Sequence, residues 1–325
     1  MKRTVVAVAA MAAALLASVV LGTAQPLPYA FQEAYRSHVF SRVSYCADSD
    51  VIQWSCGTIC DSIPGFHTEA LVQSIDLDAF GYVGVDVTRQ QIIIAFRGTR
   101  SITNWLQNLK YFRTPLLNTS CGGKCLVHRG FYHTFLSLMP QVQVTVAKLI
   151  DAHPGYRVLV TGHSLGGALA MLAAVHIQDW FNNLTIPQKA VRLYSFGAPR
   201  VGNTDFTMWA SVLLSEGPHY RITHRRDPVP HLPPSFFGFL HEPTEVFYST
   251  DDNSSVHVCQ DNATSEWKGC SNSVWAVSIG DHLKYLSEPT GCTAASTWVD
   301  EREAELPDEL YLQLTLDYLN RRSQR

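Results

Sequence analysis

The chain has 325 residues, of which 46% are hydrophobic and only 16% are charged, and its formal net charge is −3. A chain of this length can bury a large core, as one large domain or as two smaller ones. The slightly acidic balance excludes a basic nucleic-acid-binding protein, and the high hydrophobic share excludes a disordered chain.

The first 24 residues have the composition of a secretory signal peptide. Lys2 and Arg3 precede an almost unbroken apolar run from Val5 to Leu21, and small residues at positions 22 and 24 precede Gln25. A basic start, an apolar middle and a small-residue exit are typical of such a signal. An uncleaved anchor is the alternative, because the run is near the lower length for a membrane span. We expect cleavage, and therefore a secreted protein without a transmembrane segment in its mature chain.

Eight cysteines, all downstream of position 24, agree with export. An even number in an exported chain predicts disulfides, but eight cysteines allow about 105 pairings and the sequence alone cannot choose among them. The two Cys-x-x-x-Cys spacings fit either local disulfides or halves of a zinc site, and an oxidising compartment favours disulfides. The cysteines are Cys46, Cys56, Cys60, Cys121, Cys125, Cys259, Cys270 and Cys292.

Four Asn-x-Ser/Thr triplets are candidate glycosylation sites in a eukaryotic secretory pathway, provided that they lie on the surface. Such triplets also arise by chance, so the occupancy of each remains open. They begin at Asn118, Asn183, Asn253 and Asn262.

Short apolar strands alternate with helical patterns through the middle of the chain. The expected strands cover residues 91–96, 157–161, 191–196 and 220–224, and the expected helices cover residues 130–152, 166–180 and 204–214. Continuous apolar runs are typical of strands buried on both faces. Strands separated by helices predict a mostly parallel central sheet with helices on both faces, and one domain, residues 25–325, is the economical interpretation.

The C-terminal tail, residues 299–325, differs from the rest in its high charge. Pro307-Asp308-Glu309 resembles a helix start, with proline in the first turn and acids near the positive end of the helix dipole. Leu310, Leu314 and Tyr318 then fall on one face. We predict a docked terminal helix and assign the tail no chemistry.

The segment after the strand at 157–161 has the pattern of a serine nucleophile. Ser164 has Gly162 and Gly166 two residues away on either side, and a helical pattern follows. In a sharp strand–turn–helix there is no room for side chains at the flanking positions, and the serine hydroxyl is directed above the sheet. Free N–H groups at the start of the helix point at the same spot. We therefore predict Ser164 as a catalytic nucleophile in an α/β-hydrolase fold.

A serine nucleophile needs a base to accept its proton and an acid to orient that base. In this fold the order along the chain is serine, then acid, then histidine. Asp227 fits the acid because it lies in the turn after the strand at 220–224. His282, in a turn before a short helical pattern, fits the base, with His257 as its rival. We interpret His163, beside the nucleophile, as a packed turn residue.

The oxyanion that develops during acyl transfer needs preorganised N–H donors. The backbone N–H of Leu165, directly after the nucleophile, is one predicted donor. The other is expected from the loop after the strand at 91–96, where Thr99 offers its N–H and, as a further donor, its hydroxyl. We therefore predict Thr99 and Leu165 as the oxyanion hole.

Further motifs accompany these residues along the chain. The complete set is Phe96-Arg97-Gly98-Thr99, His128-Arg129-Gly130-Phe131, Gly162-His163-Ser164-Leu165-Gly166-Gly167, Phe196-Gly197-Ala198-Pro199-Arg200-Val201-Gly202-Asn203, Asp227-Pro228-Val229-Pro230-His231-Leu232-Pro233-Pro234 and His282-Leu283-Lys284-Tyr285. In this order, over roughly residues 35–292, the chain resembles the class 3 secreted triacylglycerol lipases of filamentous fungi and yeasts. The resemblance implies Ser164, Asp227 and His282 as the triad and Thr99 with Leu165 as the oxyanion hole.

The same resemblance implies three disulfides, Cys46–Cys292, Cys56–Cys60 and Cys259–Cys270. Cys121 and Cys125 then remain as a pair, similar to an additional bridge in yeast-type members. A tail as long as residues 293–325 exceeds what the simplest members of the family need.

Residues 101–113 are the expected lid. Ile102, Trp105, Leu106, Leu109 and Phe112 recur at helical spacing after a capping serine at position 101. An ordinary amphipathic surface helix would show the same pattern. The position beside the oxyanion loop, and the use of this stretch as a lid in the family, favour the lid, with Ile102, Trp105, Leu106 and Leu109 as its apolar face.

The stretch 233–240 adds apolar surface close to Asp227 in sequence. Phe236, Phe237 and Phe239 either line an acyl-binding groove or pack in the core, and the sequence favours neither interpretation.

The sequence as a whole predicts a lipase that hydrolyses triacylglycerols at oil–water interfaces, through a Ser-His-Asp triad and an acyl-enzyme intermediate. The resembled family also contains feruloyl esterases, so another carboxylesterase is the alternative. A catalytically inactive hydrolase fold that binds lipid is a third hypothesis, but no member of the predicted triad is missing. We expect no metal, no cofactor and no nucleic-acid partner. The sequence gives no prediction of the oligomeric state.

Overall fold

The computed structural model describes residues 28–184, 190–293 and 306–323. The expected signal peptide therefore lies outside the described residues. Within these ranges, no helix is both long and apolar enough to cross a membrane.

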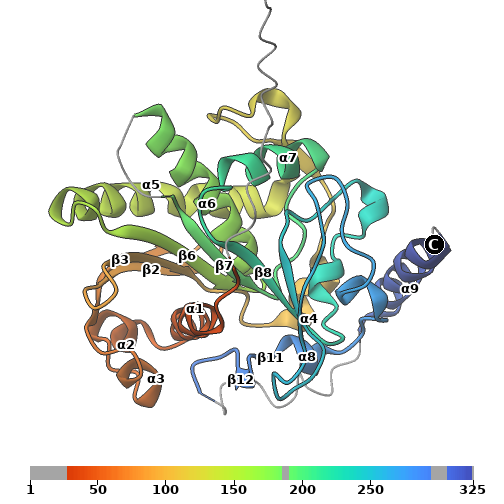
Figure 1. Ribbon diagram of the computed structural model, residues 1–325, viewed down its shortest axis with the longest axis horizontal. Helices are drawn as coiled ribbons and strands as arrows, with labels where there is room; N and C mark the ends of the chain where they lie inside the picture. The colour runs from red at the N-terminus through yellow and green to blue at the C-terminus, as the bar shows by residue number, and fades with distance from the viewer. Residues whose placement is uncertain (1–27, 185–189, 294–305, 324–325) are drawn as a thin grey trace, which may run out of the picture.

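A mixed sheet of eight strands forms the centre of the molecule, in the order β1-β2-β3-β6-β7-β8-β9-β10 (Figure 1). Its strands are β1 (Phe66–Ser74), β2 (Ala79–Asp86), β3 (Gln91–Phe96), β6 (Arg157–His163), β7 (Arg192–Phe196), β8 (His219–His224), β9 (Glu245–Tyr248) and β10 (Val256–Val258). From β3 to β9 the neighbours pair in parallel, whereas β1, β2 and β10 pair antiparallel at the two edges. The predicted mostly parallel sheet is confirmed.

Helices cover both faces of the sheet (Figure 1). On one face lie α1 (Phe31–Val43), α2 (Asp48–Gln53) and α3 (Thr58–Asp61), and on the other lie α5 (Arg129–Ala152) and α6 (Leu165–Asn183), with α7 (Thr204–Leu213) beyond them. The core is accordingly divided into two large apolar clusters, one on each side of the sheet. Helix α6 is Ala- and Leu-rich and apolar nearly all round, which suits its burial between the sheet and α5.

Shorter elements complete the chain. Strand β4 (Arg113–Pro115) pairs with β5 (Leu126–His128), and β11 (Lys284–Tyr285) pairs with β12 (Glu288–Pro289). The remaining helices are α4 (Ile102–Asn108), α8 (Ile279–His282), α9 (Asp308–Ser323) and the 3-10 turns η1 (Gly122–Lys124), η2 (Val229–His231), η3 (Ser235–Phe237) and η4 (Ser271–Ser273).

The first hairpin of the sheet, β1 and β2, was not expected from the sequence. All eight residues of β2 are buried, but two of them are glycines, which weaken a strand signal. A Cβ on Gly84 would lie 2.3 Å from the Phe66 ring, so the glycine makes room for an aromatic side chain of the neighbouring strand. Packing between the two strands therefore explains the glycine at position 84, which the strand preferences of single residues do not predict.

Four disulfides join all eight cysteines. They are Cys46–Cys292, Cys56–Cys60, Cys121–Cys125 and Cys259–Cys270, which are the pairs that the resemblance implies. Both Cys-x-x-x-Cys segments are thus paired within themselves rather than arranged as halves of a zinc site.

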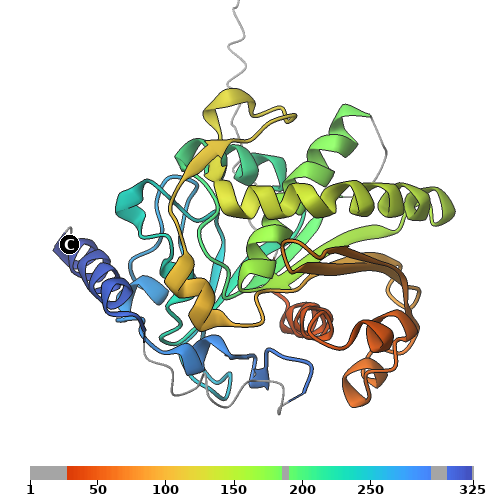
Figure 2. The same ribbon diagram turned by 180° about the vertical axis from the view of Figure 1, so that it is seen from behind.

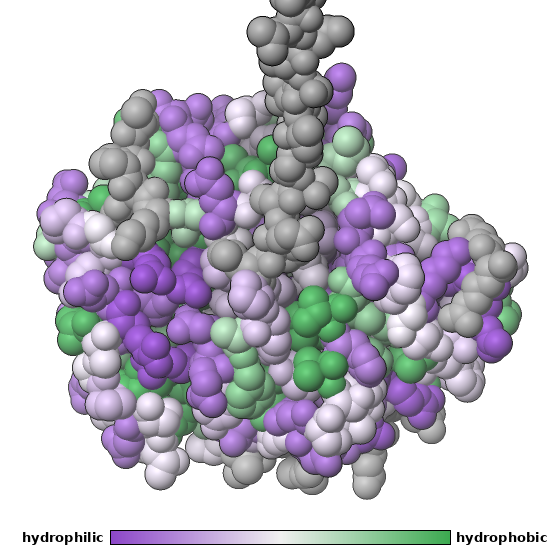
Figure 3. Space-filling view, in the orientation of Figure 1, coloured by the Kyte–Doolittle hydropathy of each residue, from purple (hydrophilic) through white to green (hydrophobic). Residues whose placement is uncertain are grey.

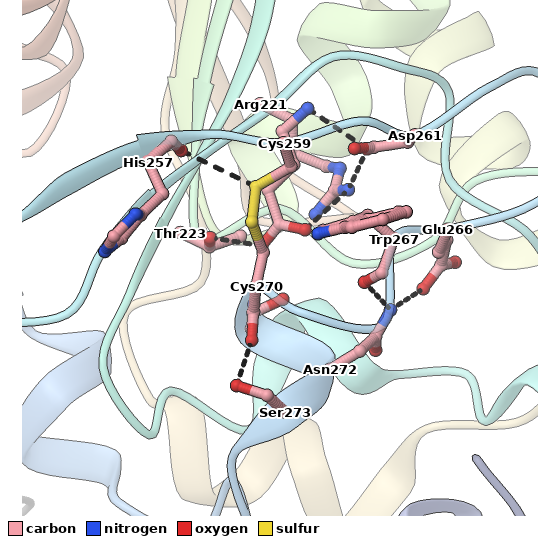
Figure 4. Close-up of a disulfide and its surroundings, with 12 residues drawn as sticks. Arg221, Thr223, His257, Cys259, Asp261, Glu266, Trp267, Cys270, Asn272 and Ser273 are labelled. Atoms are coloured by element: carbon pink, nitrogen blue, oxygen red, sulfur yellow. Dashed lines mark hydrogen bonds and ion pairs between the residues drawn. A yellow bond between two sulfur atoms is a disulfide. The ribbon is translucent and has the colours of Figure 1, made fainter. Parts of the chain in front are cut away.

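Buried charges surround the Cys259–Cys270 disulfide at the β9–β10 end of the sheet (Figure 4). The Arg221 guanidinium lies 3.1 Å from the Asp261 carboxylate and 3.5 Å from that of Glu245. Arg200 makes a two-pronged contact with Glu266, at 2.7 and 2.8 Å. Because a buried charge is tolerated only when it is paired, these contacts fix the loop between the two cysteines against the sheet.

The candidate glycosylation sites differ in accessibility. Asn118, Asn183 and Asn262 are exposed, whereas Asn253 is half-buried and its amide donates to Ser287 Oγ at 2.7 Å. Their occupancy stays a prediction.

On the face shown in Figure 3, hydrophobic surface is broken into separate patches among hydrophilic residues.

Candidate active site

Ser164 occupies the sharp turn between β6 and α6. Its φ of 58° lies in the left-handed region, which costs a non-glycine residue about 1–3 kcal/mol and persists only where the surroundings enforce it. A Cβ on Gly162 would lie 2.2 Å from the Gly166 carbonyl oxygen, and one on Gly166 would lie 2.3 Å from that of Phe96. Both glycines are therefore required by close backbone contacts, as the predicted nucleophile turn demands.

Asp227 and His282 meet beside this turn although 55 residues separate them. Asp227 follows β8, His282 ends α8, and His282 Nδ1 lies 3.0 and 2.9 Å from the two carboxylate oxygens. The carboxylate also accepts from the Val229 N–H at 2.8 Å and from the Tyr285 hydroxyl at 2.5 Å. Burial, and then the Asp227 charge, raise the pKa of Tyr285 well above its usual value, so the phenol stays protonated as a donor. These contacts orient the carboxylate toward His282.

Two polar atoms of this cluster have no hydrogen-bond partner among the described residues, Ser164 Oγ and His282 Nε2. Both side chains are almost fully buried, with 2% and 1% of their surface exposed. When Nδ1–H donates to Asp227, Nε2 is left with a free lone pair, which is the state that can accept a proton from serine. This arrangement agrees with the catalytic roles predicted for Ser164, Asp227 and His282. Those roles remain predictions.

His257, the rival base, is placed elsewhere. It is exposed on β10, where its ring bonds to Ser255 Oγ at 3.1 Å. Figure 4 shows the ring directed away from the Cys259–Cys270 disulfide. The structure therefore brings His282 to Asp227 and leaves His257 outside the site.

A hydrogen-bonded chain that the sequence did not predict links the loop after β3 to the backbone of His282. The Gly98 N–H donates to the Tyr45 hydroxyl at 3.0 Å, and that hydroxyl lies 2.9 Å from His163 Nδ1. His163 Nε2 lies 2.9 Å from the His282 carbonyl oxygen. Because the Tyr45 hydroxyl accepts from Gly98, its own proton goes to Nδ1, and Nε2–H then donates to the His282 carbonyl.

This chain needs a neutral His163. Burial, together with the neighbouring His282, lowers the pKa of His163 well below its usual value. Tyr45 thus connects the oxyanion loop, the nucleophile turn and the backbone of His282. No local pattern marks Tyr45, because 118 residues separate it from His163.

The two predicted oxyanion donors lie on neighbouring segments. A Cβ on Gly98 would lie 2.7 Å from the His163 carbonyl oxygen and 3.0 Å from Ser164 Cβ, so the loop after β3 lies directly against the nucleophile turn. Thr99 and Leu165 both line one cavity of about 410 Å³. Their role as the oxyanion hole stays a prediction.

Helix α4 lies beside this loop, at the position expected of the lid. Ser101 caps it, accepting from the Asn104 N–H at 3.4 Å. Ile102 and Leu106 are buried, with 3% and 4% of their surface exposed, in a cluster that includes Val229. Trp105 and Leu109 are partly buried against the same cluster.

The helix is shorter than predicted. It ends at Asn108, Leu109 adopts an extended conformation, and Phe112 is 59% exposed instead of continuing the apolar face. The prediction that Phe112 belongs to this helix was wrong. The chain is redirected because β4 pairs with β5 from Arg113 onward, a tertiary contact that the local pattern does not contain.

Comparisons with known proteins agree with this geometry. The family model described as lipase (class 3) matches residues 93–237. A lipase of Rhizomucor miehei is 35% identical over 243 residues, which cover 74% of this chain and 64% of that protein. The secreted mono- and diacylglycerol lipase 1 of Fusarium solani is 32% identical over 239 residues, covering 70% of this chain and 67% of that protein. The chain belongs to the class 3 lipase family.

A solved structure supports the same assignment. A triacylglycerol lipase whose catalytic centre is described as a serine protease triad has a TM-score of 0.72 and 33% identity, covering 81% of this chain and 96% of that one. This member of the class 3 lipase family therefore has the α/β-hydrolase fold. The aligned part spans less than two thirds of the full Rhizomucor miehei protein, 64% of its length.

The cavity beside Thr99 and Leu165 is bounded by side chains of the lid segment and of the start of α5. Trp105 and Leu109 of the lid segment form one wall and Phe131 of α5 another. His128, also in this wall, caps α5 by accepting from the Phe131 N–H at 3.2 Å. Burial lowers the pKa of His128 to about 4, so the imidazole is neutral and can accept at neutral pH.

None of the three phenylalanines proposed for an acyl groove lines this cavity. Phe236 and Phe237 are 48% and 40% exposed, and Phe239 is buried near His128. The Ser235 N–H and hydroxyl both donate to Asp317 of α9, at 3.1 and 2.7 Å, which holds this segment against the C-terminal helix. In the described conformation these residues therefore lie outside the cavity beside Thr99 and Leu165, and their role in an acyl groove stays a prediction.

Proposed function

We propose that this class 3 lipase is a secreted serine hydrolase that cleaves the ester bonds of triacylglycerols at an oil–water interface. The observation that carries the proposal is the amphipathic helix α4. Its Ile102 and Leu106 are buried. Its Trp105 lines the same cavity as Leu165, the residue after a serine that is itself only 2% exposed. Relatives named as secreted mono- and diacylglycerol lipases support both export and a glyceride substrate.

Under this proposal Ser164 Oγ attacks the ester carbonyl carbon while its proton passes to His282 Nε2. Asp227 stabilises the resulting imidazolium through Nδ1–H, and the N–H groups of Thr99 and Leu165 bind the oxyanion. Collapse of the intermediate expels the alcohol, which takes the proton from His282 and leaves an acyl-enzyme. Water, activated by the same histidine, then releases the fatty acid.

The lid supplies the dependence on an interface. Burying Ile102 and Leu106 is worth about 3–6 kcal/mol, which an open lid would forfeit in water and regain in part at a lipid surface. The closed state should therefore dominate in solution and the open state at an oil droplet. We assign the cavity bounded by Trp105, Leu109 and Phe131 to the acyl chain, because it lies beside both proposed oxyanion donors.

The test compares initial rates on triolein emulsion, dissolved p-nitrophenyl butyrate and methyl ferulate, with a diolein emulsion as a fourth arm because of the diacylglycerol lipase relatives. We expect the emulsions to be hydrolysed fastest. In a separate series with tributyrin, the rate should rise sharply once its concentration exceeds the solubility limit. Faster hydrolysis of the ferulate than of every aliphatic ester would replace the lipase by a feruloyl esterase with the same mechanism.

Tyr45→Phe should lower kcat about 10- to 100-fold with little change in KM. The substitution leaves the Gly98 N–H and His163 Nδ1 buried without partners, a loss of about 1–3 kcal/mol that falls on groups positioning the oxyanion loop and His282. The matched control is Tyr35→Phe, which removes a hydroxyl contact to Glu288 at 3.3 Å. The readout is kcat on dissolved p-nitrophenyl butyrate together with the melting temperature. An equal loss of kcat in both variants would show that Tyr45 has no special positioning role.

A further inference from the structure

The C-terminal helix α9 packs on the lid. Leu310 and Leu314 on its inner face are 4% and 2% exposed, and they share one apolar cluster with Ile102 and Leu106 of α4. The hydroxyl of Tyr111, in the lid segment just after α4, donates to Gln313 Oε1 at 2.8 Å. In Figure 2, α9 lies at the same end of the molecule as α4. The C-terminal helix therefore provides part of the apolar surface on which the lid packs.

The other end of α9 is anchored by polar contacts to the segment that follows Asp227. Asp317 is fully buried and accepts two hydrogen bonds from Ser235. The Arg321 guanidinium lies 2.9 Å from His231 Nδ1 and also donates to Asn272. The helix is therefore fixed by charge and hydrogen bonds at its C-terminal end, whereas it holds the lid itself through leucines, a contact that lipid can replace. Tyr318, expected on the buried face, is only half-buried, and Asp317 takes that position.

Three exposed leucines lie along the outer face of α9. Leu312, Leu316 and Leu319 are 58%, 47% and 54% exposed at the spacing of one helix face. We name these three residues the outer stripe. The exposed charged residues of α9, Asp308, Glu309 and Arg322, lie in its first and last turns, before and after the stripe. A surface helix in water normally carries polar residues at such positions, so the stripe indicates an apolar partner.

The surroundings of the stripe indicate what that partner is. Exposed Phe112 and Phe237 line a hollow of about 270 Å³ together with Leu310 of α9 and Leu106 of the lid. Helix α9 therefore carries the outer stripe and also borders this hollow through Leu310. Exposed aromatic side chains and the outer stripe therefore both lie on or next to α9, which packs on the lid.

We propose that α9 is a lipid-responsive clasp, and this rests on the proposed function. In water its inner leucines hold α4 over Ser164. At an oil or bilayer surface the outer stripe enters the apolar layer, and lipid takes over the contacts between the inner leucines and the lid, which is then released. An amphipathic helix that lies in an interface binds through such a stripe.

Binding is tested in the Ser164→Ala background, so that the result does not depend on hydrolysis. Flotation with triolein emulsion stabilised by phosphatidylcholine measures the bound fraction. We expect Leu312→Ser, Leu316→Ser and Leu319→Ser together to weaken partitioning at least tenfold. The control, Val144→Ser with Val212→Ser, replaces residues that are 73% and 76% exposed on α5 and α7 and should bind like the parent. Unchanged binding of the triple variant would overturn lipid binding by the stripe.

The clasp is tested separately with a water-soluble ester. Leu310→Ala with Leu314→Ala should raise the rate on dissolved p-nitrophenyl butyrate several-fold, because the closed lid loses part of its cover. Tyr111→Phe, which removes only the hydrogen bond to Gln313, should raise the rate in the same direction by less, and it keeps the test valid if the leucine variant fails to fold. Unchanged rates in both would overturn the clasp. If the wild-type protein shows no esterase activity at all, the proposed function fails, while the flotation result still stands.

A second copy of the chain is the competing occupant of the outer stripe. Light scattering decides between the two, since a dimer that the triple serine variant dissociates would assign the stripe to self-association and overturn the lipid surface as its partner. We expect the same mass for the wild type and the triple variant.

Discussion

Ser164→Ala and His282→Ala should each lower kcat by about 10⁶, and the double variant should be no slower than either single variant. The two side chains act as one unit in the proposed reaction, because the hydroxyl is a useful nucleophile only while the imidazole takes its proton. Once either side chain is removed, the other no longer accelerates the attack on the ester. The residual rate should come from the oxyanion donors and substrate binding alone.

The measurement is kcat on dissolved p-nitrophenyl butyrate, with labelling by a fluorophosphonate as a second readout. Ser41→Ala is a matched control, since Ser41 is a fully buried serine of α1 whose hydroxyl also has no hydrogen-bond partner among the described residues. It should keep its kcat and its labelling. If the losses of the two single variants multiplied in the double variant, Ser164 and His282 would be acting independently and the proposed mechanism would be wrong.

The parts of this site that the sequence predicts are those carried by short-range patterns. Gly162 and Gly166 mark the nucleophile turn because both lie two residues from Ser164 in a recognisable local pattern. The strands β3, β6, β7 and β8 match their predicted positions to within two residues at each end, since continuous apolar runs follow directly from burial on both faces. Chain order and turn position were sufficient to favour His282 over His257.

What the sequence does not predict depends on contacts between distant segments. Tyr45 reaches His163 only because α1 packs under the centre of the sheet, and nothing near Tyr45 in sequence signals a hydrogen bond. The lid helix ends early because Arg113 finds a β partner. Asp317 is buried on α9, where Ser235 donates two hydrogen bonds to it, and neither Phe236 nor Phe237 lines the cavity beside Thr99 and Leu165.

Replacing Cys46 and Cys292 by alanine should lower the free energy of unfolding by about 5 kcal/mol, whereas the same change at Cys56 and Cys60 should cost about 2 kcal/mol. The two bonds differ in the chain that they close, because their cysteines are 246 and 4 residues apart. In the chain-entropy account the longer loop removes far more freedom from the unfolded state. The m-value of the Cys46/Cys292 variant should also rise, since its unfolded chain exposes more surface.

Urea unfolding of the two double variants and the parent checks this expectation. Native contacts join the same segments independently of the disulfide, because Arg42 donates to the Gly291 carbonyl at 3.2 Å and to the Glu288 carboxylate at 3.0 Å. The folded Cys46/Cys292 variant should therefore keep Tyr45 in place and retain its kcat at low temperature, losing activity only where it unfolds. Equal destabilisation of the two variants would contradict the loop-length argument and would attribute the stability to local packing around each bond.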